Sequence, residues 1–358
     1  IRKVGTTLMS GRDAGFGVTS GPAVEERRIG VIGCGRIGRM HASILAREIP
    51  GFVLVAVADV VPAAAESVAA ATGAQVRSID EIFTSDDIDT VAICTSTDTH
   101  VDMIERAAAA GKAIFCEKPV SLNLALVNQA LSAVEKAGVP FMIGFNRRFD
   151  PGHKSVRDAV ADGAVGDLHV LRITSRDPAP PPPEYVAVSG GIFLDMIIHD
   201  FDMAGYVVGS PVVEVFAKGA VRVDPRIGEA GDVDTAVTVM THADGTLTTI
   251  DNSREAVYGF DQRVEAFGSG GVAVSDNPSA HAGWRRTGEQ TIAQPLPWFF
   301  LDRYMDSYRN EWKAFHTYLT EGGQSPCGTD DARACTVAAL AAGMSLREGR
   351  PIKISEVS

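Results

Sequence analysis

The chain contains three groups of residues whose types and spacing suit enzyme chemistry. Gly33, Gly35 and Gly38 follow the pattern G-x-G-x-x-G, a Glu-Lys-Pro sequence is centred on Lys118, and His199 stands four residues after an aspartate. Glycine turns bind phosphate through backbone N–H groups, whereas imidazole, carboxylate and ammonium groups exchange protons or stabilise charge. Taken singly, a turn lysine is usually solvated and an aspartate–histidine pair is usually a surface contact. Whether these residues are catalytic therefore depends on the other motifs around them.

The glycine pattern lies in the context that dinucleotide binding requires. It follows a short apolar strand at 29–32 and opens a helix, and Asp59 ends the next strand about 20 residues after Gly38. The glycines permit a tight turn, close approach of the backbone to a pyrophosphate, and close helix–strand packing. The pattern predicts a dinucleotide site that includes Arg36 and Ile37, and a plain strand–turn–helix junction is the alternative.

Asp59 indicates which nicotinamide cofactor binds. A carboxylate at this position accepts hydrogen bonds from both adenosine ribose hydroxyls and repels a 2′-phosphate. The next residues, Val60, Val61 and Pro62, supply no arginine or lysine that would attract that phosphate. The sequence therefore favours NAD over NADP.

Apolar strands alternate with helices through the first part of the chain. Continuous apolar runs are typical of strands that are covered on both faces, and this alternation predicts parallel βαβ units. Ser78 and Glu81 have the spacing of a capping box at the start of a helix. We expect a doubly wound α/β Rossmann domain over 27–148. Its strands are expected at 29–32, 53–58, 90–94, 113–116 and 141–145, and its longer helices at 36–48, 62–71, 98–110 and 124–137.

The alternation of strands and helices ends after Arg148. Strands now follow one another without intervening helices, which predicts an α+β domain over 149–358 with a large, mostly antiparallel open sheet. The last two helices could pack back on the first domain. Strands are expected at 168–175, 212–220, 235–241, 246–252 and 263–267, and helices at 153–161, 195–208, 301–319 and 330–347.

Residues 1–26 differ from the rest of the chain. They are rich in Gly, Ser and Thr and show neither helical nor strand periodicity. They also lack the charged start and continuous apolar stretch of a secretory signal. We expect a flexible N-terminal extension outside the fold, and contact with another subunit is the alternative.

The composition excludes several classes of function. Of 358 residues, 45% are hydrophobic and 22% are charged, as in folded soluble proteins. A formal charge of −12 argues against sequence-independent binding of nucleic acid, and no apolar run approaches the ~20 residues of a membrane span. The five cysteines are scattered without metal-ligand spacing, which predicts reduced thiols and a cytoplasmic location.

Chemistry-bearing residues gather near the expected domain junction. Lys118 lies at the carboxyl end of the strand expected at 113–116, where open α/β sheets bind ligands. Residues 146–150, Asn-Arg-Arg-Phe-Asp, follow the strand expected at 141–145. Asp195 and His199, four residues apart on an expected helix, should point to one face.

Together with the glycine turn, these residues resemble the glucose–fructose oxidoreductase/inositol dehydrogenase/MocA family. The Glu-Lys-Pro turn and the Asp-x-x-x-His helix carry the family resemblance. The segments 190–202 and 175–178 make it closest to the bacterial myo-inositol 2-dehydrogenases. The resemblance extends over nearly everything from Arg28 onward and implies the two-domain fold expected above.

The resemblance implies that Lys118, Asp195 and His199 are catalytic. His199 would remove the proton of a secondary hydroxyl, because imidazole titrates near neutral pH, and Asp195 would orient the ring or hold the hydroxyl. Lys118 would stabilise the developing alkoxide, although some relatives assign the proton transfer to the lysine. A metal site of His199, Asp200 and Asp202 is less favoured, since Asp200 points elsewhere and no further ligand has metal-like spacing.

The resemblance also implies contacts with substrate and cofactor. Related enzymes often carry Tyr where this chain has Phe260, which removes one possible contact with a polyol. A helix-capping role explains Thr97 or Asp98 equally well. Substrate-binding residues are expected to be Lys118, Asn146, Arg147, Asp177, Asp195, His199 and Tyr258. Cofactor-binding residues are expected to be Gly33, Gly35, Arg36, Ile37, Gly38, Asp59, Val60, Thr95, Ser96, Thr97, His100, Glu117 and Lys118.

The expected function is NAD-dependent oxidation of a cyclic polyol. By resemblance, myo-inositol is converted to 2-keto-myo-inositol (scyllo-inosose). The alternatives are scyllo-inositol, another inositol isomer or an aldose as substrate, and, outside enzymes, a regulator that binds NAD without turnover. The retained Lys118, Asp195 and His199 argue against the regulator. The resemblance also implies a homo-oligomer, a dimer or tetramer. Net charge, hydropathy and ligand spacing predict no nucleic-acid, membrane or metal partner.

Overall fold

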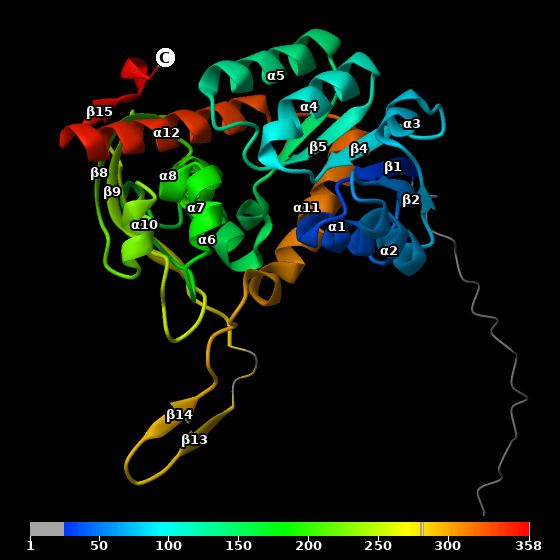
Figure 1. Ribbon diagram of the computed structural model, residues 1–358. Helices are drawn as coiled ribbons and strands as arrows, with labels where there is room; N and C mark the ends of the chain where they lie inside the picture. Colours follow the sequence, from blue (N-terminus) through cyan, green and yellow to red (C-terminus); the bar gives the residue numbers. More distant parts are fainter. Residues whose placement is uncertain (1–24, 280, 282, 358) are drawn as a thin grey trace, which may run out of the picture.

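The computed structural model describes residues 25–279, 281 and 283–357. Residues 1–24, and with them nearly all of the expected N-terminal extension, lie outside the described residues. Two sheets, each with its own helices, form the body of the molecule, and a small hairpin projects from it (Figure 1).

The first sheet is parallel and is flanked by helices. Its strand order, β3-β2-β1-β4-β5-β6, is that of a doubly wound dinucleotide-binding fold, which confirms the predicted Rossmann domain. Ser78 and Glu81 form the predicted capping box. The strands are β1 (Arg27–Ile32), β2 (Phe52–Ala58), β3 (Gln75–Val76), β4 (Thr90–Ile93), β5 (Ala113–Glu117) and β6 (Phe141–Gly144). The helices are α1 (Arg36–Arg47), α2 (Pro62–Thr72), α3 (Ile79–Thr84), α4 (His100–Ala109) and α5 (Leu124–Ala137).

The second sheet has the order β12-β11-β7-β10-β9-β8-β15. It is mostly antiparallel, as predicted, but its central strands β7 and β10 run parallel. Helices α6, α8, α9 and α12 pack on one face, and its other face carries exposed side chains. The strands are β7 (Leu168–Arg176), β8 (Val212–Ala220), β9 (Thr235–His242), β10 (Leu247–Ser253), β11 (Asp261–Gly268), β12 (Gly271–Ser275) and β15 (Ile352–Lys353). The helices are α6 (Pro151–Ala161), α8 (Gly191–Asp195), α9 (Ile198–Val208) and α12 (Thr329–Glu348).

The single helix expected at 195–208 is wrong, because the segment is divided into α8 and α9. In a continuous helix the carbonyl of Asp195 would accept a hydrogen bond from the N–H of His199. Here that carbonyl accepts from Lys118 Nζ at 3.0 Å. The carbonyl of Asp195, at the break between the two helices, is therefore bonded to a lysine from the other half of the molecule.

Several short elements were not predicted. Two helices, α7 (Pro183–Ser189) and α10 (Pro225–Glu229), each begin with proline in the first turn. Strands β13 (Trp284–Arg286) and β14 (Thr291–Ala293) pair only with each other, and all their side chains are exposed. The hairpin extends away from both sheets, at the lower left of Figure 1.

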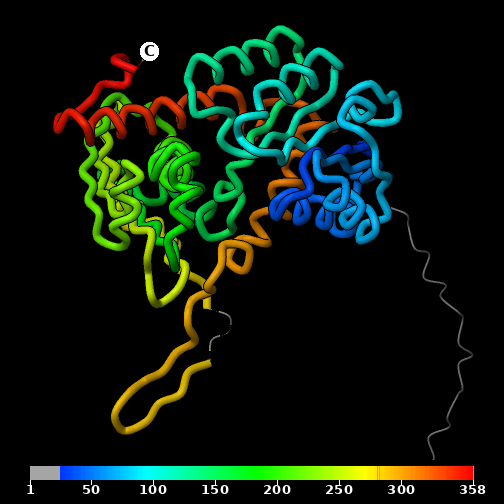
Figure 2. Tube along the Cα trace, in the orientation of Figure 1, coloured from blue at the N-terminus to red at the C-terminus, as the bar shows by residue number. Residues whose placement is uncertain are grey.

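Helix α11 (Phe300–Glu321) returns to the first sheet although it follows the second in sequence. Figure 2 shows this orange segment beside the blue N-terminal strands and helices. Its Trp312 ring lies 4.4 Å from the ring of Phe115 on β5, and Phe315 stacks 6.4 Å from Phe52 on β2. The parallel sheet is thus covered in part by aromatic residues from the C-terminal part of the chain.

Two buried ion pairs join the end of β6 to α9. Arg148 donates from Nη2 to Asp202 Oδ1 at 2.6 Å and from Nε to Asp202 Oδ2 at 2.9 Å. Arg147 donates to Asp200 Oδ1 at 2.6 Å. All four side chains are buried, so each charge depends on its partner.

Replacing Arg148 by methionine should destabilise the fold strongly. Asp202 would be left as a buried carboxylate without its cation, a loss of about 3–5 kcal/mol in the free energy of unfolding. Arg350→Met is the matched control, because Arg350 pairs with Glu348 and Glu356 at the exposed surface, where such pairs contribute about 0–1 kcal/mol. Urea unfolding measures both, and equal small losses would show that the buried pair does not hold the two halves together.

Candidate active site

A cavity of about 260 Å³ lies at the carboxyl edge of the parallel sheet. It includes Gly33 and Gly35 of the glycine turn, Asp59 at the end of β2, and Thr95 after β4. The edge of a sheet where strands end is the usual ligand site of this fold. The complete lining is Ile32, Gly33, Gly35, Asp59, Val60, Ile79, Cys94, Thr95, Ser96, Thr99 and Met103.

The glycine turn has the geometry that a pyrophosphate needs. Gly33 has φ +97°, and a Cβ atom there would lie 2.5 Å from the carbonyl oxygen of Cys94. A Cβ on Gly38 would lie 1.8 Å from the carbonyl oxygen of Gly33, so side chains are excluded at both positions. In contrast, the space beside Gly35 is open, and no side chain caps the N-terminus of α1 there. The free N–H groups and open space fit NAD phosphates.

Asp59 is held at the rim of this cavity. Its Oδ2 accepts from the N–H of Cys34 at 2.6 Å, and its Oδ1 accepts from the N–H of Val61 at 2.8 Å. Each oxygen keeps a further lone pair for a ribose hydroxyl. Val60 is 86% exposed and carries no charge, so no neighbouring cation compensates a 2′-phosphate.

The other predicted cofactor residues occupy different positions. Arg36 lies over the Phe299 ring at 5.5 Å, and Ile37 packs against the buried apolar residues of the parallel sheet and its helices. The ring of His100 is buried, with Nδ1 at 2.8 Å from the carbonyl oxygen of Pro119 and Nε2 at 3.1 Å from that of Thr95. His100 therefore joins the loop after β4 to the turn after β5.

Thr97 begins a short 3-10 helix, and α4 follows it with Thr99 at its N-cap position. No side chain caps either helix, so neither Thr97 nor Asp98 has the proposed capping contact. Glu117, at the end of β5, has its Oε1 2.7 Å from Nε2 of His41. Thr97 and Asp98 follow β4 and Glu117 ends β5, so all three lie at the same edge of the sheet. Of the three, only Glu117 has a buried side-chain partner among the described residues.

Lys118 and Asp195 meet across the junction of the two halves, but through the backbone of Asp195. Its carboxylate is held elsewhere: Oδ1 accepts from the Tyr185 hydroxyl at 2.9 Å, and Oδ2 accepts from Arg254 Nη1 at 3.2 Å. Within the described residues no hydrogen bond joins Asp195 to His199. The geometry does not provide the expected orientation of the imidazole by Asp195.

His199 is neutral at physiological pH. Burial lowers its pKa well below the usual range, and the positive charges of Lys118 and Arg147 lower it further. Its ring meets Phe145 edge-on at 5.8 Å, and its buried Nδ1 has no hydrogen-bond partner among the described residues. An unprotonated ring beside a lysine can accept a proton from a bound hydroxyl.

The next predicted residues, Asn146 and Arg147, are buried and already bonded. Asn146 Nδ2 donates to Ser307 Oγ on α11 at 3.2 Å. Arg147 binds Asp200, whose second carboxylate oxygen accepts from Asn252 Nδ2 at 2.8 Å. These contacts make Arg147 a fixed positive charge near His199.

Asp177 and Tyr258 differ in how they face the site. Burial raises the pKa of Asp177 to about 6, against the opposing effect of Arg147 and Arg254. The hydroxyl of Tyr258, which is 48% exposed, donates to Asp261 and accepts from Arg176. The structure brings Asp177 close to the charged groups of the site and places the Tyr258 hydroxyl in a separate ion-pair cluster.

Three residues around Asp195 were not predicted from the sequence. Tyr185 and Arg254 hold its carboxylate, and Arg254 Nη2 also lies 3.6 Å from Asp232. Because β7 and β10 are parallel, their carboxyl ends meet at one edge, and the N–H of Asp177 donates to the carbonyl of Ser253 at 3.0 Å. Had β7 and β10 been expected from the sequence to pair in parallel, Arg254, which follows β10, would have been placed at the site.

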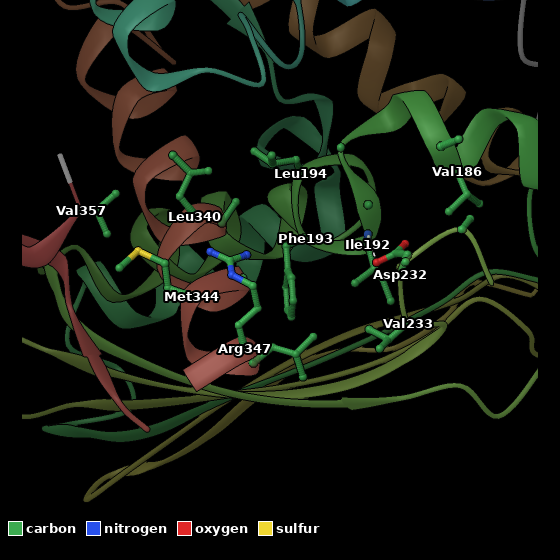
Figure 3. A pocket seen from close by; sticks show the side chains of 18 of the residues that line it. Val186, Ile192, Phe193, Leu194, Asp232, Val233, Leu340, Met344, Arg347 and Val357 are labelled. Carbon is green, nitrogen blue, oxygen red and sulfur yellow. Dashed lines mark hydrogen bonds between the residues drawn. The ribbon is translucent and has the colours of Figure 1, made fainter. Parts of the chain in front are cut away.

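A larger cavity, about 550 Å³, lies between α7, α8 and α12 and shares Asp232 with the residues just described (Figure 3). Phe193, Leu340 and Met344 line it, and its charged groups are Arg347, Asp232 and Glu356. It contains none of the residues predicted from the sequence to bind substrate or cofactor. The cleft with the glycine turn is therefore the candidate active site, although it is the smaller cavity.

The described residues show no group of three metal-ligating side chains, and no helix among them has the length and apolar character to cross a bilayer. Asp200 and Asp202, the alternative metal ligands, are bound by Arg147 and Arg148. Their carboxylates serve the ion pairs between the two halves.

Comparisons with known proteins place both halves in one family. The model of the oxidoreductase family with an NAD-binding Rossmann fold, GFO_IDH_MocA, matches residues 27–145, and the GFO/IDH/MocA C-terminal domain matches 153–274. The chain is 45% identical over 328 residues to an inositol 2-dehydrogenase of Rhizobium meliloti (strain 1021), covering 92% of this chain and 99% of the relative. It is 46% identical over 332 residues to a myo-inositol 2-dehydrogenase of Thermotoga maritima, with the same coverages.

A solved structure supports the same assignment. The scyllo-inositol dehydrogenase from Lactobacillus casei, crystallised with NAD(H) and scyllo-inositol, matches with a TM-score of 0.86 at 28% identity. The match covers 92% of this chain and 100% of that chain. The first family match contains the glycine turn and Lys118, and the second contains Asp195 and His199. The chain belongs to the GFO/IDH/MocA family and is an NAD-dependent oxidoreductase.

Proposed function

We propose that the chain oxidises myo-inositol at one ring carbon to 2-keto-myo-inositol, with NAD as the acceptor. The observation that carries this proposal is the position of His199, neutral and close to Lys118, at the edge of the sheet that also holds the cofactor cavity. Two relatives with 45–46% identity over nearly their whole length bear the corresponding names. A secondary alcohol needs the base and the cation that these two residues supply.

Each residue has a separate part in this reaction. NAD, held by the glycine turn and Asp59, would supply the acceptor for the hydride of the carbinol carbon. His199 takes the hydroxyl proton on its ring nitrogen, and Lys118 Nζ donates to the same oxygen and stabilises the negative charge that develops there. Tyr185 and Arg254 fix the carboxylate of Asp195, which accepts from a second hydroxyl of the substrate.

Asp177 binds another hydroxyl of the ring. Its carboxylate follows β7, has no hydrogen-bond partner among the described side chains, and lies near Arg147 and Arg254. A polyol offers donors at several carbons, so an unoccupied carboxylate acceptor favours it over a monohydric alcohol. Arg147 adds a fixed positive charge that favours the ionised form of Asp177.

Scyllo-inositol is the second candidate substrate. A relative in Bacillus subtilis named scyllo-inositol 2-dehydrogenase (NAD(+)) is 35% identical over 337 residues. The two isomers differ only in the direction of one hydroxyl. Phe260, which packs 5.9 Å from the Tyr304 ring, supplies no hydroxyl that could read this difference.

The chain acts as a homo-oligomer, a dimer or tetramer, in the cytoplasm. The face of the second sheet that lacks helices exposes apolar side chains from β9, β10, β11 and β12, and such patches mark interfaces. The five cysteines are unpaired, as in reducing compartments. The exposed residues are Val237, Leu247, Phe267, Val272 and Val274.

The purified protein should reduce NAD in the presence of myo-inositol and prefer NAD to NADP at least tenfold, which is about 1.4 kcal/mol. Asp59 repels the 2′-phosphate and no neighbouring cation binds it. Initial rates of NADH or NADPH formation across inositol isomers and aldoses measure both points. Tight NAD binding with no turnover of any polyol would instead favour the regulator.

His199→Ala should lower kcat by roughly 10²–10⁴-fold, the usual effect of a lost general base. The dissociation constant for NAD should change little, because the cofactor cavity lies apart from this residue. Lys118→Met should also lower kcat, whereas His281→Ala, at an exposed position outside the two large sheets, is the control. Near-normal turnover of His199→Ala would assign the proton transfer to Lys118.

The pH profile of kcat/KM should have an acidic limb near pH 6 that belongs to Asp177. Because its pKa is raised to about 6, this carboxyl is protonated below that pH and no longer accepts two hydrogen bonds. The pKa of His199 is lowered well below its usual range, so its own limb lies at more acidic pH. Asp177→Asn should remove the limb near pH 6. A limb that persists in Asp177→Asn would belong to another group.

A further inference from the structure

We infer that His41 is a positioning residue for Lys118, acting through Glu117, and that Trp312 of α11 fixes the ring of His41 for this purpose. The inference rests on the proposed function of Lys118. His41 lies on α1, is completely buried, and has Nε2 at 2.7 Å from Glu117 Oε1. On its other side, Trp312 Nε1 lies 2.8 Å from His41 Nδ1.

The direction of these hydrogen bonds follows from the indole. Trp312 Nε1 can only donate, so Nδ1 of His41 must be the acceptor and carries no proton. The single ring proton is then on Nε2, which donates to the carboxylate of Glu117. The tautomer of His41 is therefore set by a residue of the C-terminal helix α11.

The carboxylate that receives this hydrogen bond holds the backbone at Lys118. Glu117 Oε2 accepts from the N–H of Lys118 at 3.3 Å. From there the lysine side chain extends to the carbonyl of Asp195, 3.0 Å from Nζ. Three elements, α11, α1 and the end of β5, thus form one line of contacts that ends at the catalytic ammonium group.

The surroundings leave the His41 ring no other orientation. The rings of Phe115, Tyr308 and Trp312 lie edge-on to it at 5.3–5.5 Å. A ring rotated by half a turn would turn carbon atoms toward both partners. The two hydrogen bonds and the aromatic contacts therefore fix the position of Glu117 together.

Two isosteric substitutions separate positioning from packing. The amide nitrogen of His41→Gln reaches the place of Nε2 and can still donate to Glu117. His41→Asn reaches only the place of Nδ1, so it can accept from Trp312 but leaves Glu117 without a donor. Both variants leave one buried polar group unpaired, and we expect similar losses of melting temperature.

We expect kcat with NAD and myo-inositol to fall on the order of tenfold to a hundredfold in His41→Asn, and much less in His41→Gln. KM and the dissociation constant for NAD should change little in either variant. A larger deuterium isotope effect on the oxidised C–H bond in His41→Asn would show that the chemical step has slowed. Equal kcat values in the two variants, or wild-type values in both, would overturn the inference.

A spectroscopic readout separates this inference from the proposed function. The ¹³Cε resonance of Lys118, assigned by its loss in Lys118→Met, should move in His41→Asn and stay in His41→Gln. The ¹⁵N shifts of the His41 ring should show the proton on Nε2, and Trp312→Phe should populate both tautomers. If the wild type oxidises no inositol but these shifts appear, the proposed function fails, and the positioning of Lys118 by His41 through Glu117 still holds. A proton on Nδ1 of His41, or a Lys118 resonance that does not move in His41→Asn, would refute the positioning role of His41.

Discussion

The buried pairing of two consecutive arginines with two aspartates of α9 is the constraint on which the site depends. Arg147 and Arg148 follow β6, and Asp200 and Asp202 lie on one helix. Removing four charges from water is costly, and the cost is offset only when both pairs form with good geometry. Once both are formed, the axial position and rotation of α9 relative to the parallel sheet are set. His199 precedes Asp200 on that helix, so the same pairs determine where the imidazole points.

The two halves of the molecule are built from each other's segments. Helix α11 contributes Trp312 and Phe315 to the core of the parallel sheet, and the turn after β5 reaches back to the carbonyl of Asp195. That carbonyl marks the break between α8 and α9, which brings the N-terminal end of α9 near Lys118. The candidate active site therefore depends on tertiary contacts that no single segment could make alone.

Local signals in the sequence predicted most of the regular structure. The capping box at Ser78, the buried apolar strands and the glycine turn depend on neighbours within a few residues, so they can be identified without the fold. The division of the helix at Asp195 and the parallel pairing of β7 with β10 depend on partners far away in the chain. Lys118 and His199 could be named as candidates because the sequence motifs around them are local. The contacts of Asp195 with Tyr185 and Arg254 depend on distant segments and were not predicted.

The balance of charge at the site explains why it suits a neutral polyol. Lys118, Arg147 and Arg254 face the carboxylates of Asp177, Asp195 and Asp200 in one small region. Arg147 is paired with Asp200, and Arg254 with Asp195 and Asp232, so neither arginine is left alone to attract an acid into the cleft. Lys118 and Arg147 lie near His199, where they lower the pKa of the imidazole and so favour its neutral form. The carboxylates remain as hydrogen-bond acceptors, and an uncharged ring with several hydroxyl donors is the ligand that satisfies them.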